Sequence, residues 1–326
     1  MILAILIHSA LCWNEELNII ATEIYFRQLG DTPHTAVKAV LELNNEKLER
    51  DSILGAWIST VELPPINTKV FHHWRFVQTP IIKSEGNITQ HENLDDLLAE
   101  LKEFNNSLYK KTVTAPWPYT LAYKSFYGLT FDLYSPVHNA ELFRLPSKDG
   151  KTIYFEDGDD SGQKFYIKYN GVNISLYDFW ESGCGEFTKK LPFTKEDWAE
   201  VDRLVDELRE NTPYSTKEVT KSIDIVHQES HSLAVNNVYT IDIDTELSDD
   251  DDYVKKCREI THERIVNAAY KLAASTKYVY VPQFASNPPG QFISLSGLMS
   301  WAILALLVPT FLYLVWDFCH LKMKME

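Results

Sequence analysis

Positive charge and glycine are both scarce in this chain of 326 residues. Lys and Arg together number 31 against 46 Asp and Glu, which gives a formal net charge of −15. A surface this acidic repels phosphate backbones, so the composition argues against a nonspecific nucleic-acid coat protein, which depends on basic patches. The 12 glycines exclude a collagen-like repeat. Hydrophobic residues make up 45% of the chain and aromatic residues 13%, so intrinsic disorder is excluded and a packed core is expected.

Charged side chains are missing altogether from an apolar stretch at the start of the chain. Residues 1–11 read MILAILIHSAL, which is too short to span a bilayer as a helix. Small residues lie at Ala10 and Cys12, as is typical before a signal-peptidase cut. We therefore interpret residues 1–12 as a signal peptide. A buried N-terminal helix is the alternative, because no Lys or Arg precedes the apolar part.

A second stretch without charge, residues 292–316, lies close to the C-terminus. Its 25 residues, at about 1.5 Å per residue, are long enough to cross a hydrocarbon core of about 30 Å. We therefore predict a transmembrane helix there. Residues 282–291 precede it and are interpreted as a linker, because prolines and polar residues there cannot continue a helix.

Lysines on one side of the predicted transmembrane helix set the expected topology. Lys322 and Lys324 lie in the short tail, residues 317–326, which the positive-inside tendency places in the cytosol. The protein is then expected to be a single-pass type I protein of a secretory-pathway or cell-surface membrane. Residues 13–281 would form its lumenal or extracellular domain. Three N-glycosylation sequons agree with this topology, although each arises readily by chance. Their asparagines are Asn87, Asn105 and Asn173.

Cysteine is rare, with four residues in the whole chain. Cys12 would leave with the signal peptide, and Cys319 would lie in the cytosolic tail. Cys184 and Cys257 then remain in an oxidising compartment, where two thiols are expected to form a disulfide. Closing a loop of that length would stabilise the domain by roughly 4 kcal/mol in the chain-entropy treatment. Two buried free thiols are the alternative.

Apolar residues recur at helical spacing in most of the predicted extracytosolic domain. Thr194 and Asp197 resemble a capping box ahead of one such segment. Only residues 151–169 look extended, with apolar and polar residues alternating near the end of that stretch after a turn at residues 157–162. We therefore predict a mainly α-helical domain with one small β-hairpin. The helical segments are residues 17–25, 94–101, 198–208 and 254–272.

Two polar clusters outside these segments have ordinary structural explanations. His227 and His231 have the i, i+4 spacing of zinc ligands but lack the H-E-x-x-H order, so an exposed helix face is the simpler interpretation. Residues 249–252 are four consecutive acids. They are interpreted as a solvated loop that favours the start of the next helix, with calcium binding as the alternative.

Three segments in the middle of the chain carry a resemblance to a known family. They read DLYSPVH at residues 132–138, DDSGQKFYIKYNG at 159–171 and VNISLYDFWESG at 172–183. In order and spacing they resemble the zinc-dependent single-strand nucleases of the S1/P1 type, whose members read roughly H-x-x-x-D-x-H-Q-P-L-H, D-x-G-G-N-x-F and N-L-H-x-x-W-D. Trp13 after the signal peptide, SILGAWIST at 52–60, HHWRFVQTP at 72–80 and the late helix extend the likeness over residues 13–280.

This resemblance implies the S1/P1 nuclease or phospholipase C-like fold, which is mainly helical. It also implies three zinc ions that activate a water and polarise the phosphate of single-stranded DNA or RNA or of a 3′-nucleotide. Mapped onto this chain, Trp13, Asp132 and His138 retain the ligand type, and Glu181 replaces an aspartate. The other positions have lost it, because glycine has no side chain to coordinate and arginine repels a cation. They are Asn18, Ser59, Arg75, Gly128 and Tyr177.

The lost ligands lead to two functional hypotheses. The preferred one is a membrane-anchored pseudoenzyme that uses the nuclease-type fold to bind a protein or glycan partner, without a catalytic residue or a cofactor. The alternative is an active phosphodiesterase, endonuclease or nucleotidase with one zinc held by Asp132, His138 and Glu181, acting on single-stranded nucleic acid or a nucleotide. A membrane protein unrelated to these nucleases is a third interpretation, which requires the ordered motif likeness to be accidental.

Overall fold

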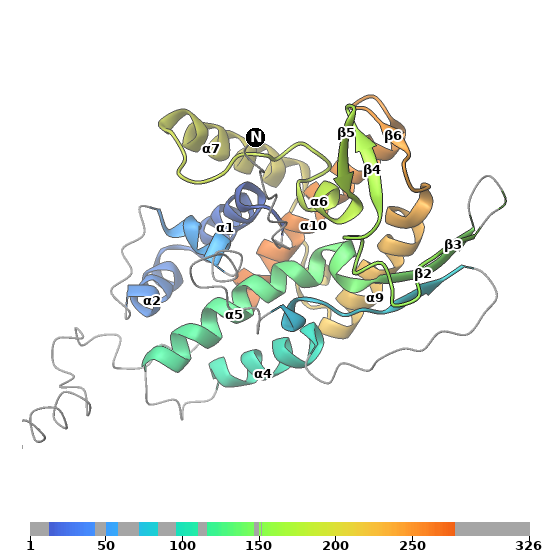
Figure 1. Ribbon diagram of the computed structural model, residues 1–326. Helices are drawn as coiled ribbons and strands as arrows, with labels where there is room; N and C mark the ends of the chain where they lie inside the picture. Colours follow the sequence, from blue (N-terminus) through green and yellow to red (C-terminus); the bar gives the residue numbers. More distant parts are fainter. Residues whose placement is uncertain are drawn as a thin grey trace, which may run out of the picture. The chain divides into compact units, whose positions relative to one another are not determined.

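The computed structural model describes residues 13–42, 50–57, 72–83, 96–109, 116–146, 150 and 152–277 (Figure 1). The predicted signal peptide, linker, transmembrane helix and cytosolic tail lie outside these residues, as do Ser59 and the sequon asparagine Asn87. Within the described part of the chain, no helix combines the length and the apolar character that crossing a bilayer requires.

Three long helices form the centre of the domain. They are α1 (Glu15–Leu29), α5 (Pro116–Tyr134) and α10 (Asp252–Thr276), and α10 packs against both of the others (Figure 1). The side chain of Asn14 accepts a hydrogen bond from the backbone N–H of Leu17 and so caps the start of α1. Most of α1 is buried, because other elements contact it on several sides.

Hydroxyl groups link these three helices inside the core. The Tyr25 hydroxyl on α1 lies 2.5 Å from the Tyr123 hydroxyl on α5 and 3.0 Å from the Thr276 hydroxyl at the end of α10. All three residues are buried. Buried hydroxyls cost free energy unless they are hydrogen-bonded, so these contacts fix how the three helices meet.

Shorter helices surround this centre. The expected stripe of α7 is present, since Val201, Val205 and Leu208 are buried, and Thr194 and Asp197 form the predicted capping box. In Figure 1, α4 runs beside α5, in agreement with their many contacts. The α-helices are α2 (Asp31–Glu42), α4 (Leu97–Tyr109), α6 (Leu176–Glu181), α7 (Lys195–Asn211), α8 (Thr216–Val219) and α9 (Ile223–Asn236). The 3-10 helices are η1 (Asp51–Ala56), η3 (His73–Arg75), η4 (Pro136–Asn139) and η5 (Val238–Thr240).

The expectation of one small β-hairpin is wrong, because the described residues form two three-stranded sheets. In each sheet an antiparallel pair is joined by a parallel third strand from elsewhere in the chain. A parallel partner distant in sequence leaves no local pattern, which explains why the sequence did not indicate it. The first sheet has the order β1 (Pro80–Ile82), β2 (Glu141–Pro146), β3 (Thr152–Tyr154), and the second β5 (Val172–Ser175), β4 (Tyr166–Tyr169), β6 (Glu246–Leu247).

The hairpin of the second sheet is formed by β4 and β5, one strand later in the chain than the sequence predicted. The predicted strand is present as β4, but its partner is the following β5, through a turn at Asn170 and Gly171. Both turn residues have positive φ, +48° and +77°, as a two-residue hairpin turn requires. The turn at residues 157–162 instead leads the chain back across β2, since the backbone N–H of Asp159 donates to the Leu142 carbonyl.

Cys184 and Cys257 form the predicted disulfide, with their Cα atoms 6.1 Å apart. Cys184 follows α6, and Cys257 lies in the first half of α10. Both residues are buried in a core that also contains side chains of the two sheets. Beside the disulfide, the indole N–H of Trp180 donates to the Tyr253 hydroxyl over 2.9 Å. The disulfide therefore fixes the segment that follows α6 against α10.

Candidate functional site

Five of the mapped ligand positions meet at the end of α5. Asp132 comes from α5, Arg75 from η3, His138 from η4, and Tyr177 and Glu181 from α6. Each is at most 3% exposed. The short η3 and η4 segments bring Arg75 and His138 to the end of the long helix, and α6 covers them from the other side. The result is a closed polar cluster inside the protein.

Arg75 and Asp132 form a fully buried ion pair. The guanidinium Nε lies 3.2 Å from Asp132 Oδ2, and both side chains are 0% exposed. Removing two charges from water is expensive and is compensated only when the charges meet directly. This pair therefore explains how a carboxylate and a guanidinium are both accommodated in the core.

His138 is neutral and uses both ring nitrogens. Its Nδ1 lies 2.7 Å from the carbonyl oxygen of Arg75, and because a carbonyl can only accept, Nδ1 carries the proton. Nε2 then accepts, and the Tyr177 hydroxyl lies 3.1 Å away. Burial lowers the pKa of His138 to about 4, which keeps the ring uncharged at neutral pH. The Phe76 ring stacks on the imidazole with centroids 4.5 Å apart.

Glu181 completes the cluster from α6. Its Oε1 accepts a 2.7 Å hydrogen bond from the Ser135 hydroxyl, and its Oε2 lies 3.3 Å from His138 Nε2. Burial raises the pKa of Glu181 to about 8, so the carboxyl group is mainly protonated at neutral pH. A neutral carboxyl group and a neutral imidazole leave the Arg75–Asp132 pair as the charged part of the cluster.

The other mapped positions that the structure describes, Trp13, Asn18 and Gly128, lie at the margin of this cluster. Asn18 is buried on α1, and its amide donates to the Trp13 carbonyl. Asn14, which follows Trp13 in the chain, donates its backbone N–H to the Glu181 carbonyl over 2.8 Å. This contact places the start of α1 beside α6. Gly128 is buried on α5, one turn before Asp132. The mapped positions within the described residues thus gather around the ends of α5 and α6.

These residues do not fit the three-zinc centre that the family resemblance implies. Asp132 Oδ1 lies 3.9 Å from His138 Nδ1, whereas Glu181 lies on the Nε2 side of the same ring. The imidazole lies between the two carboxyl groups, which therefore face opposite nitrogens of the ring. In the part of the chain that the structure describes, no group of three or more His, Cys, Asp and Glu side chains could hold a metal ion.

A second buried polar cluster was not expected from the sequence. Glu141, at the start of β2, accepts backbone hydrogen bonds from Asp160 and Ser161 over 2.7 and 2.9 Å. Asp159 Oδ1 accepts from the backbone N–H of Leu142 over 2.9 Å. Burial is the main cause that raises the pKa of Glu141 to about 7 and that of Asp159 to about 8. The two acids anchor the loop before β4 onto β2.

Glycine at position 158 is required by this second cluster. Gly158 has a φ of +81°, and a Cβ atom there would lie 1.9 Å from Glu141 Oε1. The sequence signal that could have drawn attention to the loop is its unusual density of Asp, Ser and Gly. Nothing in the local pattern indicated that Glu141 would pair with it.

The expectation of an exposed helix face for His227 and His231 is wrong. Both lie half-buried on α9. His227 Nδ1 is 2.8 Å from Asn139 Oδ1, and its Nε2 is 3.2 Å from the Thr79 hydroxyl. His227 therefore joins α9 to η4 and to the residue before β1.

The four acids at residues 249–252 agree with the predicted solvated loop, since Asp249 and Asp250 are exposed and Asp252 begins α10.

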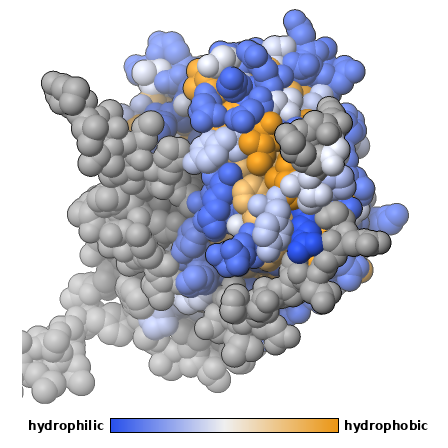
Figure 2. All heavy atoms as spheres, turned by 45° about the vertical axis from the view of Figure 1, so that its right-hand side comes forward, coloured by the Kyte–Doolittle hydropathy of each residue, from blue (hydrophilic) through white to orange (hydrophobic). Residues whose placement is uncertain are grey.

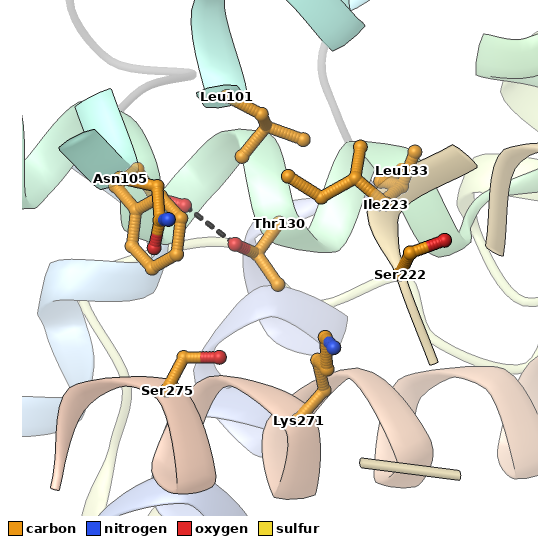
Figure 3. Close-up of a pocket in the computed structure, with 9 residues that line it drawn as sticks. Leu101, Asn105, Thr130, Leu133, Ser222, Ile223, Lys271 and Ser275 are labelled. Carbon is orange, nitrogen blue, oxygen red and sulfur yellow. Dashed lines mark hydrogen bonds between the residues drawn. The ribbon is translucent and has the colours of Figure 1, made fainter. Parts of the chain in front are cut away.

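A cavity of about 210 Å³ lies on another side of α5, between α4, α9 and α10 (Figure 3). Leu101, Leu133 and Ile223 supply apolar walls, and the sequon asparagine Asn105 lines it from α4. Lys271 also lines the cavity, but its ammonium group donates to the carbonyls of Val219, the last residue of α8, and Lys221, two residues beyond it. These hydrogen bonds explain the position of Lys271 without a bound ligand.

The two described sequons differ in exposure, and this leads to a testable difference. Asn173 is exposed on β5, so a glycan there would extend into solvent, whereas Asn105 is half-buried on α4. We expect Asn173→Gln to reduce an endoglycosidase-sensitive shift in electrophoretic mobility, and Asn105→Gln to leave that shift unchanged. Asn105→Gln is the control for the effect of the substitution itself. A shift that is lost only in Asn105→Gln would contradict the expectation.

Comparison with known families agrees with this geometry. The sequence profile of the S1/P1 nuclease family matches residues 18–280. The match covers most of the chain and all of the elements that form the buried cluster, so the chain belongs to the S1/P1 nuclease family. No protein with a curated description matches it.

Proposed function

We propose that this member of the S1/P1 nuclease family is a membrane-anchored pseudoenzyme whose extracytosolic domain binds a partner or serves as a scaffold. One observation carries the proposal: the side chains that could ligate zinc are already paired with one another and with Arg75. Asp132 binds the guanidinium, and His138 and Glu181 take part in a hydrogen-bonded chain with Tyr177 and Ser135. Recruiting a metal there would break these contacts and leave Arg75 buried beside a second cation.

The chemistry of phosphodiester hydrolysis also supports the proposal. A zinc enzyme of this kind needs an open coordination position for water and access for the phosphate. Asp132 and His138 are 0% exposed and Tyr177 is 1% exposed. Within the described residues, these buried side chains present almost no exposed surface that a phosphate group could contact. The buried cluster is better suited to holding elements together than to turnover.

A binding role is consistent with the surface and with the sequence. On the face shown in Figure 2, apolar side chains reach the surface in a narrow strip surrounded by hydrophilic residues. Exposed large side chains on the two sheets include Tyr154 (54% exposed), Tyr166 (39%) and Val172 (66%). Exposed aromatic residues among polar ones suit contacts with proteins or glycans, whereas the net charge of −15 disfavours nucleic acid. The uncharged residues 292–316 support the membrane anchor.

The proposal is tested by assaying hydrolysis together with metal content. Full-length protein, purified in a mild detergent, is incubated with single-stranded DNA, single-stranded RNA and a 3′-nucleotide, with added zinc and with a chelator. We expect no turnover above that of an Asp132→Ala variant and less than one zinc per chain by elemental analysis. Arg203→Ala, which alters an exposed ion pair on α7, controls for damage caused by substitution and purification.

The active one-zinc alternative makes the opposite prediction. Turnover that a chelator abolishes, that zinc restores, and that His138→Ala and Glu181→Ala both remove would overturn the pseudoenzyme proposal. Turnover that His138→Ala and Glu181→Ala both retain would indicate a contaminating nuclease, and the pseudoenzyme proposal would then stand.

A further inference from the structure

The carboxylate of Asp132 requires a positive charge, because it is fully buried at the end of α5. By the family resemblance this position is a zinc ligand, and the metal would supply that charge. In this chain two described side chains lie within ion-pairing distance of Asp132, namely Arg75 and His138. If one of these side chains supplies the charge, the carboxylate does not need a metal ion to compensate it.

The hydrogen bonds assign this role to Arg75. Its Nε lies 3.2 Å from Asp132 Oδ2 and donates to it. His138 Nδ1 is 3.9 Å from the other oxygen and is directed instead to the carbonyl of Arg75 at 2.7 Å. The imidazole therefore does not donate to the carboxylate. A guanidinium is permanently charged, so the compensation persists at every physiological pH.

We propose that the guanidinium of Arg75 is a resident cation that takes the structural place of a metal ion beside Asp132, so that the domain folds and stays folded without zinc. The inference goes beyond the loss of catalysis: an enzyme can lose activity and still depend on a structural metal. Its tests measure stability rather than turnover, so its failure and the failure of the pseudoenzyme proposal are distinguishable.

The backbone around Arg75 makes it a positioning residue for the whole cluster. The Val77 N–H donates to the His138 carbonyl over 2.8 Å, while the Arg75 carbonyl holds the His138 ring. Phe76, between them, stacks on the same ring. Arg75 thus connects α5 through its side chain and η4 through its carbonyl. A metal ion joins separate chain segments in a comparable way, by binding ligands from each of them.

The first experiment uses the unaltered protein. Thermal unfolding of the full-length chain is followed with added zinc, without added metal and after treatment with a strong chelator. A ligand that binds the folded state raises the unfolding midpoint, so a structural zinc would reveal itself by a concentration-dependent rise. We expect the three midpoints to agree within about 1 °C. A rise with zinc that the chelator reverses would overturn the proposal.

The second experiment is a double-mutant cycle. Arg75→Met is expected to lower the unfolding midpoint by roughly 10 °C, because it leaves Asp132 buried without its partner. Adding Asp132→Asn to that variant removes the remaining charge, and we expect it to recover at least half of the loss. Two losses that simply add in the double variant would refute direct pairing of these side chains.

Arg264 provides a matched control for the cycle. It is another buried arginine, 5% exposed, and it donates to the Tyr134 carbonyl and to the Ser230 hydroxyl. Its carboxylate partner is Glu229, at 3.7 Å, and not Asp132. Arg264→Met should destabilise the protein, but Asp132→Asn should not recover that loss. If Arg75→Met yields no folded protein, soluble expression is compared instead. Recovery of folded protein in the double variant supports the proposal, and failure of the double variant while Asp132→Asn alone folds overturns it.

Discussion

Replacing Cys257 with serine is expected to lower the free energy of unfolding by about 4 kcal/mol. The disulfide joins Cys184 and Cys257 across 73 positions of the sequence, and removing it increases the conformational freedom of the unfolded chain. Both cysteines are buried, so the substitution also places a hydroxyl in an apolar core. Urea unfolding of the full-length protein without reducing agent measures the difference.

Cys319→Ser is the matched control, because Cys319 is not part of this disulfide. It should leave the unfolding midpoint unchanged. A reducing agent should destabilise the unaltered protein and Cys319→Ser alike, yet have little further effect on Cys257→Ser. Unaltered protein that keeps the same stability in the presence and absence of reductant would contradict the assignment of the stabilisation to this bond.

The stability of the protein is expected to decline as the pH rises from about 6 to about 9, and Asp159→Asn should remove roughly 2–3 kcal/mol of that decline. Burial raises the pKa of Asp159 to about 8 in the folded protein, from an unperturbed value of 3.8. The folded state therefore retains a proton that the unfolded state has already released. Stability falls with rising pH until Asp159 also ionises in the folded state. The amide of Asp159→Asn has no such proton to lose, so the variant lacks this part of the decline.

This pH dependence is measured as the midpoint of thermal unfolding across the range. Glu141→Gln should flatten the curve less, because the pKa of Glu141 is raised only to about 7. Asp250→Asn, which changes an exposed aspartate in the loop before α10, should leave the shape of the curve unaltered. A curve for Asp159→Asn that is as steep as that of the unaltered protein would exclude the buried acid as a source of the decline.

The long helices could be predicted from the sequence because their signals are local. Apolar spacing and the capping box of Thr194 and Asp197 identified α7, and similar spacing identified α1 and α10. The sheets could not be predicted in the same way. β1 pairs with β2 about sixty residues later, and no pattern within either strand records the partner. The Asn170–Gly171 pair is the exception, because this dipeptide is a local signal for the hairpin turn between β4 and β5.

The candidate site shows a similar division between what could and could not be predicted. The family resemblance related Arg75, Asp132, His138, Tyr177 and Glu181 to one centre, and the structure places them together. The contacts themselves could not be inferred, because whether Arg75 would turn toward Asp132 depends on how η3 packs on α5. Glu141 and Asp159 belong to no motif of the resemblance. Their burial in a second cluster could not be predicted, because it depends on how the loop before β4 packs against β2.

The hydroxyl of Thr276, which closes α10, bears on how the domain would respond to a mechanical load. It contacts Tyr25 of α1, and Tyr25 in turn contacts Tyr123 of α5. Tension applied to the chain after α10 would have to separate these buried hydroxyls before the last turn of the helix could unwind. The pull would therefore be shared among three helices, and the domain should resist peeling from its C-terminal end.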